Sequence, residues 1–121
     1  MSAVLERPDA PDLLAIARAT VLEEILPALP EAHRLAARMV ANALGIAQRM
    51  IAVDPSRLAA LEARAAALAG SADDPWAGLC ALIRSGAADP GSERHDGVAA
   101  LLADLARLRC ETSAPKTLAG G

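Results

Sequence analysis

The spacing of apolar residues predicts a chain of helices. Asp9 is a typical N-cap residue, and Pro11 and Asp12 favour a helical turn directly after it. Apolar positions then recur at helical spacing: Leu14, Ala17, Val21, Leu22 and Ile25. Pro27 disfavours helical geometry at the residue before it, so this helix is expected to end or kink around residues 26–29.

The segment 31–53 is predicted to be the central helix. Its apolar residues lie on nearly every side, a pattern typical of a helix buried among several others. Ala37, Ala41 and Gly45 follow at i, i+4 and i+8, and they predict another backbone at close range, since a mid-helix glycine otherwise costs about 1 kcal/mol. A polar stripe also recurs along this helix: Arg34, Arg38, Asn42, Gly45 and Arg49.

Capping residues predict the helices that follow. An Asp-Pro pair at 54–55 and another at 74–75 each open a helix, and Gly70 and Gly86 end these two helices. Ser92 is expected to cap the last helix, which has the cleanest apolar periodicity in the chain, at Val98, Leu101, Leu102, Leu105 and Leu108.

Composition supports an all-α fold class. Hydrophobic residues make up 54% of the chain, yet Trp76 is the only aromatic residue, so alanine and leucine supply most of the apolar mass. A β domain would need β-branched and aromatic residues, which are scarce here. We therefore predict a single-domain bundle of about five helices over residues 1–121, with an ordered core at about 9–112 and a frayed tail at 113–121.

Charge and hydropathy exclude several classes of partner. The net charge of −3 and the lack of aromatic stacking residues argue against nucleic-acid binding. No apolar run is long enough to span a membrane, and no signal peptide is expected at the N-terminus. Cys80 and Cys110 suit neither a zinc site nor a disulfide, so each is expected to be a small core residue in a reducing cytoplasm.

No catalytic, cofactor or metal site is predicted. His33 and His95 are the only histidines, and neither has a second ligand at metal-binding spacing. The dense segment Ser92–Asp96 is interpreted as a capped helix start with acidic residues in its first turn.

The polar stripe of helix 31–53 is the one candidate site. In the structural interpretation, Arg38, Asn42 and Arg49 bond to neighbouring loops and carboxylates and fix the register of the helix. In the functional interpretation, the same residues and Arg84 form the floor of a groove for an anionic ligand or an acidic partner segment.

Several segments resemble a small all-helical bacterial domain of unknown function. They are Pro11-Asp12-Leu-Leu, Leu26-Pro27-Ala-Leu, Arg38-Met-Val-Ala-Asn42-Ala-Leu and Ile83-Arg84-Ser-Gly86. The resemblance covers about residues 9–112 and is most specific at Ala-Asn-Ala-Leu. Such domains tend to be encoded beside aminoglycoside-phosphotransferase-like kinases and acyl-CoA dehydrogenases. The resemblance implies no catalytic residue.

Two functions follow as hypotheses. The preferred one is a non-catalytic accessory module that docks on a kinase-like phosphotransferase or an acyl-CoA dehydrogenase. The alternative is a binder or enzyme of an anionic acyl or phosphorylated compound, held by Arg38, Asn42, Arg49 and Arg84. A homodimer is also expected, because a bundle rich in alanine and leucine leaves an apolar face to be covered.

Overall fold

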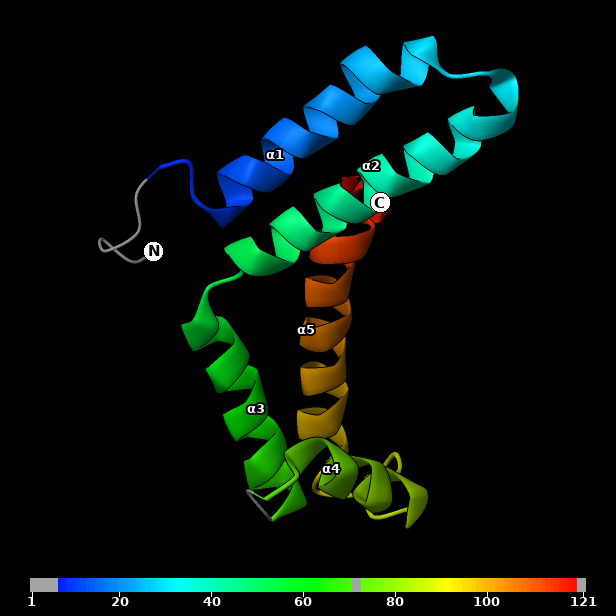
Figure 1. Cartoon of the computed structure of the whole chain (residues 1–121). Helices are drawn as coiled ribbons and strands as arrows, with labels where there is room; N and C mark the ends of the chain where they lie inside the picture. Colours follow the sequence, from blue (N-terminus) through cyan, green and yellow to red (C-terminus); the bar gives the residue numbers. More distant parts are fainter. Residues whose placement is uncertain (1–6, 71–72, 120–121) are drawn as a thin grey trace. The chain divides into compact units, whose positions relative to one another are not determined.

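The computed structural model describes residues 7–70 and 73–119, and within them it contains six α-helices and no strand (Figure 1). The helices are α1 (Ala10–Thr20), α2 (Glu31–Ala52), α3 (Pro55–Ala69), α4 (Pro75–Arg84), α5 (His95–Ser113) and α6 (Pro115–Ala119). They form two compact units, Met1–Ala52 and Val53–Gly121. The all-α prediction is confirmed, and a single domain over residues 1–121 stays a prediction.

The predicted cap opens α1. The carboxylate of Asp9 accepts a hydrogen bond from the backbone N–H of Asp12 at 3.1 Å, and the Asp12 carboxylate accepts one from the Asp9 N–H at 3.2 Å. Such a reciprocal pair satisfies two donors at a helix start. After Thr20 the chain continues as a π-helical turn, Val21–Ile25, and a 3₁₀ turn, Leu26–Ala28, before Leu29 becomes extended. The expected end around residues 26–29 is therefore confirmed.

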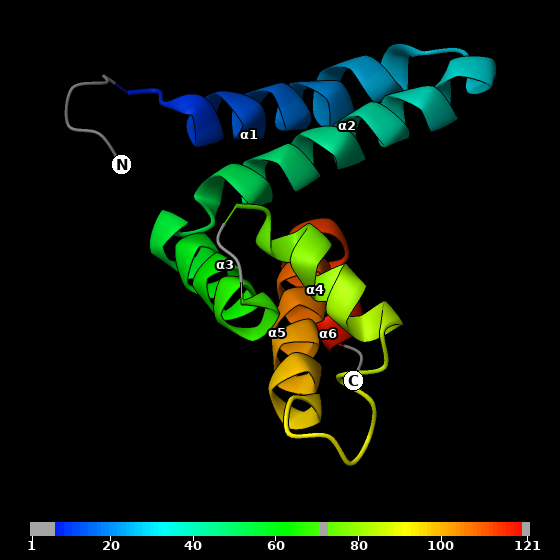
Figure 2. The ribbon, with the colours of Figure 1, turned by 90° about the horizontal axis from the view of Figure 1, so that it is seen from below.

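In the first unit, α1 and α2 run side by side in opposite directions (Figures 1 and 2). The buried residues of α2 are Ala37, Ala41 and Gly45, so the close approach predicted from these small residues is confirmed. The prediction that α2 is buried on nearly every side is wrong. Within this unit α2 packs on α1 and the turns that follow it, and small side chains bury little area, so most of its large apolar residues remain exposed.

In the second unit, the predicted starts of α3 and α4 are confirmed. Asp54 caps α3 by accepting a hydrogen bond from the N–H of Ser56 at 2.9 Å, and Asp74 caps α4 by accepting one from Ala77 at 3.2 Å. Gly70 ends α3 with a φ of 74°, a left-handed conformation that favours glycine.

In the second unit, α3, α4 and α5 lie close together (Figure 2), and they share one buried core with the loop before α5. Its centre is Leu101, which has 0% exposure. The core residues are Leu61, Ala65, Leu79, Ala88, Val98, Leu101 and Leu108. The apolar periodicity of the last helix therefore identified three of them, Val98, Leu101 and Leu108.

Three local predictions for this unit are wrong. Helix α5 begins at His95 rather than after Ser92, because hydrogen-bonded turns continue the loop: the N–H of Ser92 donates to Asp89 O and that of His95 to Ser92 O. The tail is not irregular throughout, since Pro115–Ala119 forms α6; residues 120–121 lie outside the described residues. The two cysteines were expected to be core residues, but Cys80 is exposed and Cys110 is half-buried; both are free thiols.

Candidate functional site

The outer face of α2, away from α1, is apolar and exposed. Leu35 retains 67% of its accessible surface and Met39 retains 64%. Leu35, Met39, Ile46 and Met50 follow at i, i+4, i+11 and i+15, so they line up along one side of the helix, and we name them the apolar strip. Ile46 is half-buried and the other three are exposed. Large apolar side chains exposed in a row along one side of a helix are typical of an interaction site.

The predicted polar stripe lies along the edge of this strip. Arg38, Asn42 and Arg49 each follow a strip residue by three positions, which makes them its neighbours on the helix surface. Arg38 and Asn42 are exposed and make no hydrogen bond or ion pair with the part of the chain that the structure describes. Arg49 is half-buried. The expectation that this stripe runs through a packed interior is therefore wrong.

Arg18 of α1 joins this edge, and the sequence did not single it out. A Cβ placed on Gly45 would lie 3.3 Å from the Arg18 Nε and 3.4 Å from an Arg49 Nη1. Both guanidinium groups therefore lie against the same glycine of α2. We name Arg18, Arg38 and Arg49, together with Asn42, the arginine edge. The only sign of this contact in the sequence was the glycine at position 45, which leaves room for a neighbouring side chain. Which side chain of α1 lies there depends on the register of α1 against α2.

The sequence also placed Arg84 in the candidate groove. Arg84 is exposed in the last turn of α4, in the second unit, whereas the other three residues belong to α2 in the first. The two pockets described for this chain contain none of the four predicted residues.

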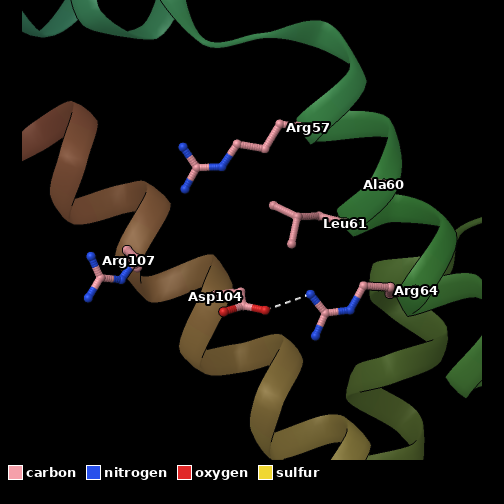
Figure 3. A pocket seen from close by; sticks show the side chains of 6 residues that line it. All are labelled: Arg57, Ala60, Leu61, Arg64, Asp104 and Arg107. Carbon is pink, nitrogen blue, oxygen red and sulfur yellow. Dashed lines mark hydrogen bonds and ion pairs between the residues drawn. The ribbon is translucent and has the colours of Figure 1, made fainter.

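One of these pockets, of about 240 Å³, lies between α3 and α5 (Figure 3). Arg57 and Arg64 extend from α3 toward α5 with Leu61 between them (Figure 3). Arg64 donates to the Asp104 carboxylate at 2.6 Å, and Arg57 donates to Glu111 at 2.5 Å. Arg107 also lines the pocket and makes no direct hydrogen bond or ion pair with the described residues. Two of the three arginines are thus neutralised by carboxylates of α5, and these pairs hold α3 against α5.

The Arg57–Glu111 pair makes stability depend on pH. The hydrogen bond from Arg57 lowers the pKa of Glu111 below its ordinary value of 4.5, and the charges of Arg57 and Arg107 add to this, against a smaller opposing effect of burial. A lowered pKa adds stability that is present above the unfolded-state pKa and is lost as the pH falls through the folded-state pKa.

We therefore expect Arg57→Gln to lower the melting temperature slightly at neutral pH, because partly exposed pairs contribute little. The difference from the unaltered chain should shrink as the pH falls from about 4.5, where Glu111 of the unfolded chain becomes protonated, through the lowered pKa of Glu111 in the folded chain. Thermal unfolding followed by circular dichroism between about pH 6 and pH 3 measures this. Arg109→Gln, an exposed arginine of α5, is the control. A difference that stays constant with pH would contradict the assignment.

The second pocket, of about 200 Å³, lies beside the loop before α5. His95 lines it, and the Nδ1 of its ring lies 3.0 Å from the carbonyl oxygen of Ala88, so the ring is held by the loop. Over residues 7–70 and 73–119, no group of three or more His, Cys, Asp or Glu side chains is placed to hold a metal ion. Nor does any helix there combine the length and the apolar character needed to cross a membrane.

Fold and site together define an all-helical protein with an exposed, arginine-edged apolar face. The chain belongs to the family described as a domain of unknown function, DUF6285, whose model matches residues 27–117. This match confirms the resemblance at the level of an uncharacterised helical family; it includes α2 with the apolar strip, and Arg18 lies before it. No curated protein and no solved structure matches the chain.

Proposed function

We propose that this protein is a non-catalytic helical interaction module that docks on a partner enzyme through the outer face of α2. The exposure of Leu35 and Met39 in the apolar strip carries this proposal. Large apolar side chains left in water cost free energy, and burying each of them against a partner would recover about 1.5–3 kcal/mol. Methionine adds adaptability, because its flexible thioether chain fits surfaces of different shape.

The partner that we propose is a kinase-like phosphotransferase or an acyl-CoA dehydrogenase. The support for this choice is the resemblance to domains encoded beside such enzymes, and the proposed place of action is the cytoplasm. The alternative, a binder or enzyme of an anionic acyl or phosphorylated compound, has weaker support. It requires a pocket at Arg38, Asn42 and Arg49, whereas the two pockets described lie elsewhere in the sequence.

Co-expression tests the proposal. The chain is produced with a tagged kinase-like phosphotransferase and, separately, with a tagged acyl-CoA dehydrogenase, each from a gene beside a member of the family. We expect one of them to form a complex that survives size-exclusion chromatography. The double variant Leu35→Ser with Met39→Ser should reduce the recovered complex at least about tenfold, because a few buried apolar residues dominate most interfaces.

Leu102→Ser is the matched control, since Leu102 is also an exposed large apolar residue but lies on α5. It should leave the recovery unchanged. The proposal is wrong if neither enzyme forms a complex, or if the strip variant and the unaltered chain recover equal amounts.

A further inference from the structure

We infer that the partner segment bound by α2 is an amphipathic helix whose apolar side is bordered by aspartate or glutamate. This inference rests on the proposed function and adds to it the chemistry of the partner. Its basis is the arrangement of the apolar strip beside the arginine edge, both of which belong to the first unit.

The strip has the geometry of a helix-packing surface. From Leu35 to Met50 it runs 15 residues along α2, which corresponds to about 22 Å. A straight row of large apolar side chains at spacings of four and seven residues is the pattern that a second helix covers when it packs along the first at a shallow angle. A partner helix of about four turns therefore matches the whole strip.

The charges beside the strip determine what borders that partner helix. Arg34, Arg38 and Arg49 lie on α2, and no aspartate or glutamate occurs between Glu31 and Asp54, although the whole chain has a net charge of −3. Arg34 is already engaged, because it donates to the Leu29 carbonyl oxygen and pairs with Glu31. Arg38 has no such bond within the described residues, and Arg18 likewise has none.

Docking would bring the arginine edge next to the border of the partner helix. A guanidinium group donates well to carboxylates, and its charge in a partly desolvated interface rewards an opposite charge and disfavours a like one. Asn42, between Arg38 and Arg49, offers an amide that donates to a carboxylate or a backbone carbonyl. A helix bordered by acidic residues offers carboxylates to Arg18, to Arg38 and to this amide.

A second copy of the chain would suit the arginine edge less well than an acidic helix. Two copies of α2 packed on each other would face the arginine edge with a helix that carries no carboxylate between residues 32 and 53. In an antiparallel pair related by a two-fold axis, the same edges meet, so arginines would lie near arginines. The apolar strip alone would suit a homodimer, but the charge pattern favours an acidic partner.

A pair of synthetic peptides tests this inference on the full chain. Both are helices of about 18 residues with the same leucine stripe; glutamate borders the stripe in one and lysine in the other. Fluorescence anisotropy with labelled peptides measures both dissociation constants. We expect the glutamate peptide to bind at least about tenfold more tightly than the lysine peptide, and added salt to weaken its binding.

Variants of the chain test which residues set this preference. The double variant Arg38→Glu with Arg49→Glu should bind the lysine peptide more tightly than the glutamate peptide, whereas Arg109→Glu on α5 should keep the original preference. Circular dichroism confirms that each variant remains helical.

Four outcomes would overturn the inference. They are equal binding of the two peptides, no binding of either, and displacement of the glutamate peptide by inorganic phosphate at comparable concentration. The fourth is a dimer of the unaltered chain, seen by sedimentation at micromolar concentration, that becomes a monomer in the Met39→Ser variant.

Failure of the proposed function gives a different set of results. If the strip variant loses the partner enzyme and the charge-reversed variant keeps it, docking stands and the acidic border is wrong. If the strip variant keeps the partner enzyme, docking through α2 is wrong.

Discussion

Leu101→Ala is expected to destabilise the second unit by about 2–5 kcal/mol, which is the cost of removing a buried leucine side chain and leaving a cavity. Leu101 is the largest fully buried side chain among the described residues, with 0% exposure. Neighbours from α3, α4 and α5 surround it in one core, so no single element can move to fill the space. Small domains have only about 5–15 kcal/mol of stability in total, so this loss should unfold a measurable fraction of the chain at 37 °C.

Urea unfolding followed by circular dichroism measures the effect, and the adjacent residue supplies the control. Leu102 retains 41% of its accessible surface, so Leu102→Ala removes the same atoms from a solvated position. Its cost should stay below about 1 kcal/mol. Similar costs for the two variants would mean that α5 presents a different face to the core.

The sequence was sufficient for the elements and for part of the core. Aspartate caps and glycine stops depend on neighbours within one turn, so the boundaries at Asp54 and Gly70 could be predicted locally. The start of α5 could not, because the turns from Asp89 to His95 compete with a cap at Ser92 through backbone hydrogen bonds of the folded loop. Periodicity proposed both Leu101 and Leu102, and only packing distinguishes the buried residue from the exposed one.

The candidate site, like the fold, could be predicted from the sequence only in part. The small residues of α2 predicted a close neighbour, and the polar stripe was identified residue by residue at Arg38, Asn42 and Arg49. An all-round apolar pattern, however, gives no information on how many helices cover it. An α2 helix packed on α1 keeps its apolar strip exposed, and this changes the stripe from an interior polar feature into the edge of a docking surface. Arg18 could not be found, because its place against Gly45 depends on the register of two helices.

Ala41→Leu tests the packing that positions this surface, and it should disrupt the hairpin of α1 and α2. Ala41 is only 2% exposed and lies in the middle of the small-residue contact with α1. A leucine there requires the helices to separate, and overpacking of this kind costs about 1–3 kcal/mol. Helix α1 has no fully buried residue, so little other burial opposes the separation. Hydrogen exchange should therefore show loss of amide protection across residues 10–52, while α3 and α5 keep theirs.

The same substitution two positions along the helix is the matched control for this prediction. Ala43 is exposed, and residues two positions apart lie on different faces of a helix, so Ala43→Leu should leave the protection of α1 unchanged. It would also enlarge the apolar surface next to Met39 and Ile46, which are its i−4 and i+3 neighbours. Ala43→Leu should therefore preserve or strengthen docking, whereas Ala41→Leu should weaken it by dismantling the hairpin. If both variants left α1 protected, the small residues of α2 would not set its distance from α1, and the placement of Arg18 against Gly45 would lose its basis.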